Sequence, residues 1–436
     1  CGDLGVLRSA LLLTVLISPL LGVLIASGGN PVVTIAVDLY HAPYSNGLDV
    51  LIESCPGCRW ILVVYAYDPG AWALGDRYRG MGYNVEVRQG GFGEGVLDGV
   101  DMLVIGAFHG DSARGFEDWE LGSLTGWWAS GERRVIWIAS VGDFIVEYPR
   151  ITSLGPTCIV SNNPPARAFG WHSQFNANRL LEALGSRIRV DMASISSPWG
   201  PVEGFIVSGA LGLKEGKVIL PMAAPLYVVQ GNTTVNPFNT SLEGISVVVY
   251  AESTISNYDN PREVRDLSKD PVFYEKGAKG TYPVMVVERL EGRMVVVSGD
   301  TMVGGFIGAY ASGCHLNVIQ AGLYSPYWEW PASTGEVRKE NYEGPALVKA
   351  TIAHAVRFIA GERAEELLSR KPRTETTTEH TMYTTGYPES WYVTQAPETG
   401  YYVEGERLTE LLTRLALVFI VTFVIVLSLL RLLRRA

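Results

Sequence analysis

Short apolar runs alternate with longer mixed segments through the first third of the chain. The runs predict buried strands at 32–37, 60–65, 84–87, 102–105 and 135–138. The segments between them predict helices at 47–54, 71–82 and 116–129, the last beginning with acidic residues that suit a helix N-terminus. Strands without polar alternation, separated by helices, are typical of a parallel sheet covered on both faces. We therefore expect an α/β fold with a doubly wound, mainly parallel sheet.

The second half predicts a helix at 176–184 and shorter strands that add antiparallel pairing to this sheet. These strands lie at 218–220, 227–229 and 245–250, and a hairpin joins 284–288 to 294–298 through a charged turn. A last helix at 344–360 closes the body.

Both ends of the chain carry long apolar segments. Residues 9–26 lack charge and end in small residues, which predicts a signal peptide or signal anchor within 1–30. Residues 408–433 predict a transmembrane helix, with a buried core helix as the alternative, and Arg431, Arg434 and Arg435 place the basic tail 434–436 in the cytosol. The body, 31–361, then faces outward from a cell membrane on a Thr-rich stalk, 362–407, and the protein is single-pass after signal cleavage or two-pass without it.

The amino-acid composition excludes several classes of protein. With 47% hydrophobic and 18% charged residues among 436, the chain is neither disordered nor a coiled coil. Its net charge of -10 gives no basic surface for a nucleic acid, so nucleic acid is not an expected partner.

One order of strands and turns runs through the segments 32–45, 99–105, the helix 117–128 with the strand 135–138, and 295–300. This order resembles the GIFT-type domains. These occur in GldG-like gliding and transport proteins, in intraflagellar-transport proteins and in a non-catalytic oligosaccharyltransferase subunit, and they are degenerate relatives of class I glutamine amidotransferases. The resemblance implies a flavodoxin-like or amidotransferase-like sheet over 31–361 and a non-catalytic scaffold in a membrane complex.

The amidotransferase nucleophile is missing from the corresponding turn. Amidotransferases use a Cys on a sharp strand-to-helix turn, whereas here the strand runs into Ser140-Val141-Gly142-Asp143. Ser140 is an alternative nucleophile, but the Gly-x-Ser-x-Gly frame is absent. We expect no catalytic residue and no cofactor.

Four cysteines follow the first apolar segment. Cys55 and Cys58 form a C-x-x-C motif after a helix rather than before one, which favours a structural disulfide over a redox site. Cys158 and Cys314 would then pair with each other, and a zinc site formed by all four cysteines is the alternative.

Acidic residues and histidines gather at strand ends, at Asp38, His41, His109, Asp143 and Asp300. Such ends line one crevice in a doubly wound sheet, so these residues are candidates for a ligand or divalent-metal site. The alternative is that they cap the turns that follow the strands.

Two further features concern the surface. Asn232 and Asn239 begin glycosylation sequons. Tyr324, Tyr327, Trp328 and Trp330 lie in a Pro-bounded loop that either contacts a carbohydrate or protein or folds back on the body.

We therefore expect a membrane-anchored, extracytoplasmic binding or scaffold subunit, with an ABC-type transporter or a glycan-transfer assembly as candidate partner. The alternatives are an exported metal-dependent hydrolase that uses the strand-end Asp/His cluster, and a structural cell-surface protein.

Overall fold

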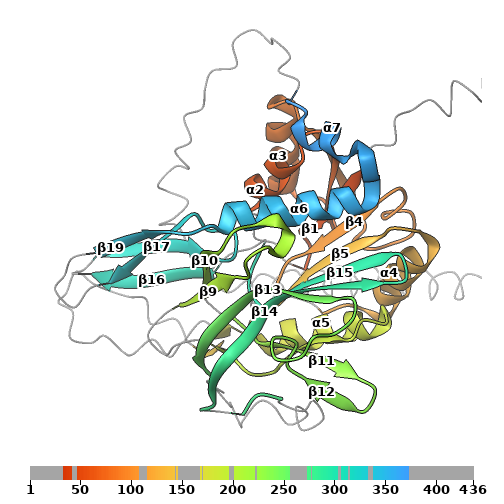
Figure 1. Ribbon diagram of the computed structural model, residues 1–436. Helices are drawn as coiled ribbons and strands as arrows, with labels where there is room; N and C mark the ends of the chain where they lie inside the picture. Colours follow the sequence, from red (N-terminus) through yellow and green to blue (C-terminus); the bar gives the residue numbers. More distant parts are fainter. Residues whose placement is uncertain are drawn as a thin grey trace, which may run out of the picture. The chain divides into compact units, whose positions relative to one another are not determined.

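Ten strands form one mixed sheet in the computed structural model (Figure 1). The structure describes residues 33–41, 47–107, 115–142, 144–145, 167–168, 170–195, 201–220, 223–255, 273–275, 277–302, 306–312, 315–331 and 337–372. All of them belong to one unit, Cys1–Glu375. The sheet order is β10-β9-β13-β14-β15-β5-β4-β1-β2-β3.

Six neighbouring strands of this sheet run parallel. They are β3 (Asn84–Gln89), β2 (Arg59–Val64), β1 (Thr34–Asp38), β4 (Met102–Ile105), β5 (Val135–Ala139) and β15 (Arg293–Ser298). Five of them, β1, β2, β4, β5 and β15, consist almost wholly of buried residues. The predicted α/β fold with a mainly parallel sheet is confirmed.

The strand order reverses between β1 and β4. From β1 the chain moves outward to β2 and β3, and it then crosses to the other side of β1 to form β4 and β5. In such sheets, ligands bind outside the carboxyl ends of the strands at this switch point. Asp38, the last residue of β1, lies at it.

Antiparallel strands extend the sheet beyond β15. They are β14 (Lys279–Leu290), β13 (Ile245–Thr254), β9 (Val202–Ile206) and β10 (Gly216–Leu220). The predicted hairpin is present, because Leu290 pairs with Arg293 and Glu291 and Gly292 adopt positive φ in the turn. The strand β9 was not predicted, since its sequence Val-Glu-Gly-Phe-Ile is neither continuously apolar nor free of Gly.

Helices cover both faces of the sheet (Figure 1). One core cluster includes residues of α2 (Leu48–Ser54), α3 (Pro69–Gly80), α6 (Gly344–Ala360) and α7 (Ala364–Ser369). The other includes residues of α4 (Asp118–Ser130) and α5 (Gly170–Ala183). Within β1, Ile35 and Val37 join the first cluster and Ala36 the second, as the alternation of a strand requires. The sheet is therefore doubly wound.

The remaining elements are small. They are β6 (Phe144–Ile145), β7 (Arg167–Ala168), β8 (Ile188–Val190), η1 (Ala210–Gly212), β11 (Leu226–Gln230), β12 (Thr233–Val235), β16 (Phe306–Ser312), β17 (His315–Ala321), β18 (Tyr327–Pro331), β19 (Val337–Asn341) and η3 (Gly361–Arg363). Strands β12, β11 and β8 form a separate three-stranded sheet, and β6–β7, β16–β17 and β18–β19 are two-stranded pairs.

The folded body continues past the predicted end at 361. Helix α6 has the predicted bounds, but α7 follows it, and Ala364 and Leu367 are buried in the core. The first residues of the predicted stalk thus belong to the body. Segment 1–30, residues 373–407 of the stalk, 408–433 and 434–436 lie outside the described residues.

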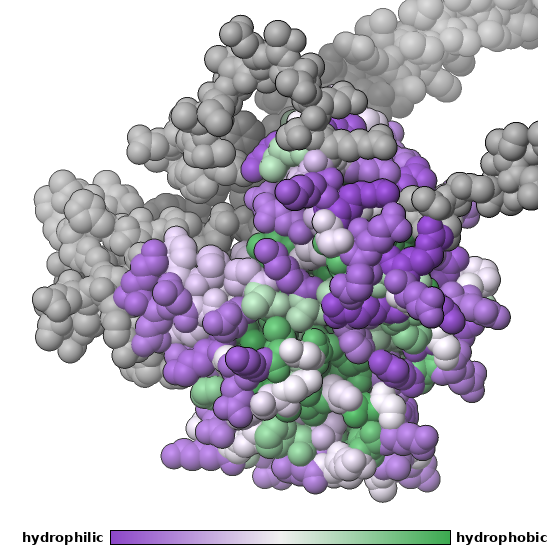
Figure 2. Space-filling view, turned by 45° about the horizontal axis from the view of Figure 1, so that its top comes forward, coloured by the Kyte–Doolittle hydropathy of each residue, from purple (hydrophilic) through white to green (hydrophobic). Residues whose placement is uncertain are grey.

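Among the described residues, none of the helices combines the length and apolar character needed to cross a membrane. Figure 2 shows hydrophilic residues over much of the face it presents, with hydrophobic residues gathered toward its lower middle.

Candidate functional site

Asp38 organises the turn that follows β1. Its Oδ1 accepts hydrogen bonds from the backbone N–H groups of Tyr40 (3.0 Å) and His41 (3.2 Å). Its Oδ2 lies 2.8 Å from Nδ1 of His41. The carboxylate therefore holds the backbone of the turn and the imidazole at the switch point together.

Helix α4 brings a second carboxylate to the same imidazole. Nε2 of His41 lies 3.4 Å from Oε2 of Glu120, and this oxygen also accepts from the backbone N–H of Glu117 (3.0 Å) in a capping box. Asp38, His41 and Glu120 are all buried, at 0%, 1% and 1% exposure. Together they form a buried ionic cluster, called the switch-point cluster below.

The two carboxylates keep His41 protonated. Burial alone would lower the pKa of the imidazole, but the charge and hydrogen bond of Asp38, followed by Glu120, outweigh burial and raise this pKa to about 9. The cluster thus contains an imidazolium between two carboxylates at neutral pH.

Aromatic rings enclose the imidazolium. The rings of Phe92, Phe116 and Tyr40 lie with centroids 5.4, 4.9 and 4.6 Å from that of His41. Phe92 and Phe116 are buried, so the cluster is in an apolar surrounding in which charges interact strongly.

The structure brings together two of the five predicted strand-end residues, Asp38 and His41. Asp300 lies after β15, where its Oδ1 accepts from the backbone N–H (2.6 Å) and the Oγ1 (3.3 Å) of Thr301. Burial, and then the charge of Asp300, raise the pKa of Tyr324. His109 and Asp143 lie outside the described residues. Among the residues that the structure does describe, no group of three His, Cys, Asp or Glu side chains is arranged to hold a metal ion.

Ser140, at the turn that corresponds to the amidotransferase nucleophile, is buried. Its hydroxyl donates to Oγ of Ser173 on α5 (3.2 Å). A side chain at Gly142 would meet the backbone oxygen of Ala223 and Ser194. The turn is thus packed against neighbouring segments.

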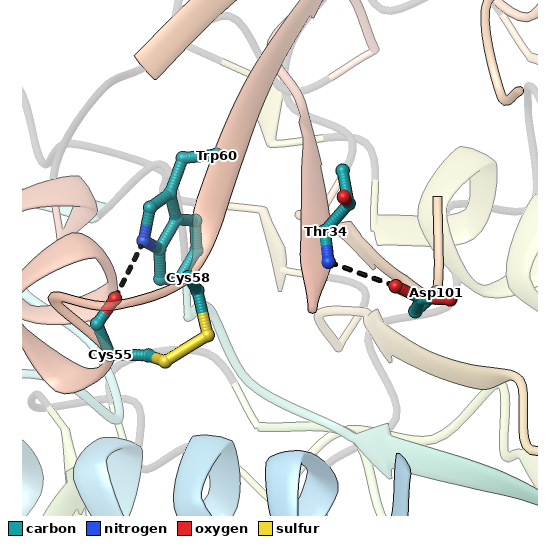
Figure 3. The surroundings of a disulfide bond; sticks show 5 residues. All are labelled: Thr34, Cys55, Cys58, Trp60 and Asp101. Carbon is teal, nitrogen blue, oxygen red and sulfur yellow. Dashed lines mark hydrogen bonds between the residues drawn. A yellow bond between two sulfur atoms is a disulfide. The ribbon is translucent and has the colours of Figure 1, made fainter. Parts of the chain in front are cut away.

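Cys55 and Cys58 form a disulfide, as predicted (Figure 3). Both residues are fully buried, and the indole N–H of Trp60 donates to the carbonyl of Cys55 (3.1 Å). The N–H of Gly57 donates to the carbonyl of Leu367 on α7 (3.0 Å). The disulfide turn therefore joins α2 and β2 to helix α7. Cys158 and Cys314 lie outside the described residues.

The predicted contact loop is partly buried. Tyr324 packs against Gly47 before α2, and Trp328 on β18 is buried, whereas Tyr327 is exposed with Nζ of Lys339 3.7 Å from its ring centroid. The structure does not describe the side chain of Trp330. Both sequon residues, Asn232 and Asn239, are exposed.

Sequence reasoning missed three residues at this edge of the sheet. Glu120 is one, although its spacing from Glu117 is the capping-box signature. The others are Tyr65, directly after β2 and stacked on Tyr40 with centroids 4.7 Å apart, and Trp119 on α4. Tyr65 is 50% and Trp119 49% exposed.

Fold and site together define a doubly wound α/β domain with a buried ionic cluster at its switch point. Comparison of the chain with protein-family models, with curated proteins and with solved structures gives no match.

Proposed function

We propose that the chain is a membrane-anchored, extracytoplasmic module without catalytic activity, which binds partners as a subunit or scaffold of a membrane complex. The candidate partners are an ABC-type transporter and a glycan-transfer assembly. The proposal is based on two features of the chain: its folded α/β body and the apolar segments at 9–26 and 408–433.

One observation carries the non-catalytic part of the proposal. Three of the described polar groups at the carboxyl edge of the sheet are engaged inside the protein: Asp38 with its own turn and His41, Asp300 with Thr301, and Ser140 with Ser173. A nucleophile or general base must reach a substrate atom, and these three side chains are fully buried.

The sheet order supports the proposed relation to the GIFT-type and amidotransferase-like domains. Without the edge strand β3, the order β2-β1-β4-β5-β15 is the flavodoxin-like order 2-1-3-4-5. The exposed sequon residues Asn232 and Asn239 agree with an extracytoplasmic body.

Purification of the tagged full chain from its native membrane tests the proposal. We expect a membrane protein to co-purify in a constant ratio with the wild type, with Ser140→Ala and with Asp300→Asn, because neither variant changes an exposed side chain. Metal content and hydrolytic turnover are measured on the same preparations. Stoichiometric metal or turnover that is lost in Asp300→Asn would favour the hydrolase, and a wild-type chain that purifies alone would contradict membership of a complex.

A further inference from the structure

Two half-exposed aromatic rings, those of Tyr65 and Trp119, lie close to Gly91, which is also close to the switch-point cluster. A Cβ placed on Gly91 would lie 3.4 Å from Cδ2 of Tyr65 and 3.9 Å from Cη2 of Trp119. Gly91 adopts φ +58°, a backbone conformation that disfavours a side chain. Both rings therefore lie within 4 Å of the same side-chain position on bare backbone.

A carboxylate oxygen lies close to the same position on Gly91. The same Cβ position on Gly91 is 3.2 Å from Oε1 of Glu120. This oxygen is buried and, among the described residues, has no hydrogen-bond donor, whereas Oε2 of the same side chain faces both His41 and the N–H of Glu117. A buried carboxylate oxygen without a donor is costly and calls for a partner.

Charge in the cluster favours a cationic partner. Among the described residues of the cluster, Asp38 and Glu120 are acidic and His41 is the single basic side chain, so acidic groups outnumber basic ones. The chain as a whole also carries a net charge of -10. Aromatic ring faces attract cations, and a carboxylate accepts strong hydrogen bonds from ammonium N–H groups.

We propose that Gly91, Tyr65, Trp119 and Oε1 of Glu120 form a binding site for the ammonium group of a small alkylamine. The ammonium N–H groups donate to Oε1, and the rings of Tyr65 and Trp119 cover the alkyl part. The two rings turn aside to admit the ligand, and half-exposed side chains change rotamer readily. The site does not depend on the proposed membrane partner, since all of its residues lie within the body.

Ligand-observed saturation-transfer NMR on the purified full chain tests this site, with n-butylammonium as the probe. Butan-1-ol is the neutral counterpart, tetramethylammonium is a cation without N–H donors, and glucose tests a sugar site. We expect butylammonium to bind at millimolar concentration and more tightly than the other three. Stronger binding of glucose, or equal binding of butan-1-ol, would overturn the assignment.

Four variants locate the site. Glu120→Gln retains the shape of the side chain and removes its charge, so butylammonium should bind about 10-fold more weakly. Trp119→Ala and Tyr65→Ala should each weaken binding about 3-fold, because each removes one ring. Tyr67→Ala is the matched control, since this ring is 70% exposed and stacks on Trp72 instead.

Thermal unfolding of each variant confirms that it is folded before titration. Unchanged binding in folded Glu120→Gln, or an equal loss in Tyr67→Ala, would contradict the proposed site.

Discussion

Two buried glutamates, one on a strand of the antiparallel region and one on helix α4, which packs on the parallel region, differ in how many of their oxygens accept hydrogen bonds. In the antiparallel region, Glu288 on β14 accepts from Oγ of Ser186 (2.6 Å) and the N–H of Arg187 (2.9 Å) through Oε2. Its Oε1 accepts from Nε of Arg187 (2.6 Å). In the parallel region, Glu120 uses Oε2 but leaves Oε1 without a donor among the described residues. The two side chains are equally buried, but of the two only Glu120 has an oxygen without a donor among the described residues.

The largest expected effect tests whether the switch-point cluster holds the parallel region together. Asp38→Ala removes the main partner of a buried imidazolium and the acceptor for two backbone N–H groups. Breaking a buried ion pair in this way should lower the free energy of unfolding by about 3–5 kcal/mol.

Chemical denaturation measures the effect of Asp38→Ala. Asp118→Ala is its control, because Asp118 is exposed and pairs with Arg179 on the surface, where a loss of about 0.5 kcal/mol is expected. A loss below about 1 kcal/mol for Asp38→Ala would mean that the cluster is not a stabilising contact.

The pH dependence of the free energy of unfolding also tests how much the switch-point cluster stabilises the fold. His41 has a pKa raised from 6.5 to about 9, so the folded state binds an extra proton between these values. Its contribution to stability is fully present below pH 6.5 and is lost as the pH rises through 9, in all about 3 kcal/mol. Denaturation at pH 6.5 and 9.5 should show this fall. Asp38→Asn should flatten it, and an equal fall in that variant would assign the effect to other groups.

The third prediction concerns the buried disulfide between Cys55 and Cys58, an uncharged contact beside the parallel region. The double substitution Cys55→Ser and Cys58→Ser removes the cross-link and should cost about 2 kcal/mol, because the loop that it closes is short. Denaturation of the oxidised wild type and of the variant measures the loss. Reductant added to the folded wild type should have little effect, since both cysteines are buried, and rapid reduction would contradict this burial.

The sequence predicted the parallel region better than the antiparallel one, for a physical reason. Strands buried on both faces, such as β4 and β5, are continuously apolar and are recognisable on their own. Strand β9, with intermediate exposure and a glycine, becomes a strand only through its pairing with β10 and β13.

The candidate site shows the same limit of sequence reasoning. Asp38 and His41 are neighbours in the chain and were predicted together, whereas Glu120 reaches them from a helix 79 residues beyond His41. Its contact depends on how α4 packs on the sheet, which no local pattern encodes. Tyr65 and Trp119 are far apart in the sequence, and only the folded structure shows that both lie beside Gly91.

The smallest expected effect is that of Glu120→Gln, and its comparison with Glu288→Gln is the most direct test of the difference between the two glutamates. Glu288→Gln places an amide group against donors on both oxygens and removes the charge partner of Arg187, so it should cost about 2–3 kcal/mol. Glu120→Gln weakens the pairing with His41, but it also removes the cost of burying a charge, and the amide oxygen can still accept from Glu117. These changes oppose each other, so the net loss should stay within about 1 kcal/mol. Denaturation of both variants under one condition decides between the two cases. An equal loss would show that Glu120 is as fully engaged as Glu288 and would remove the physical basis for a ligand at its open oxygen.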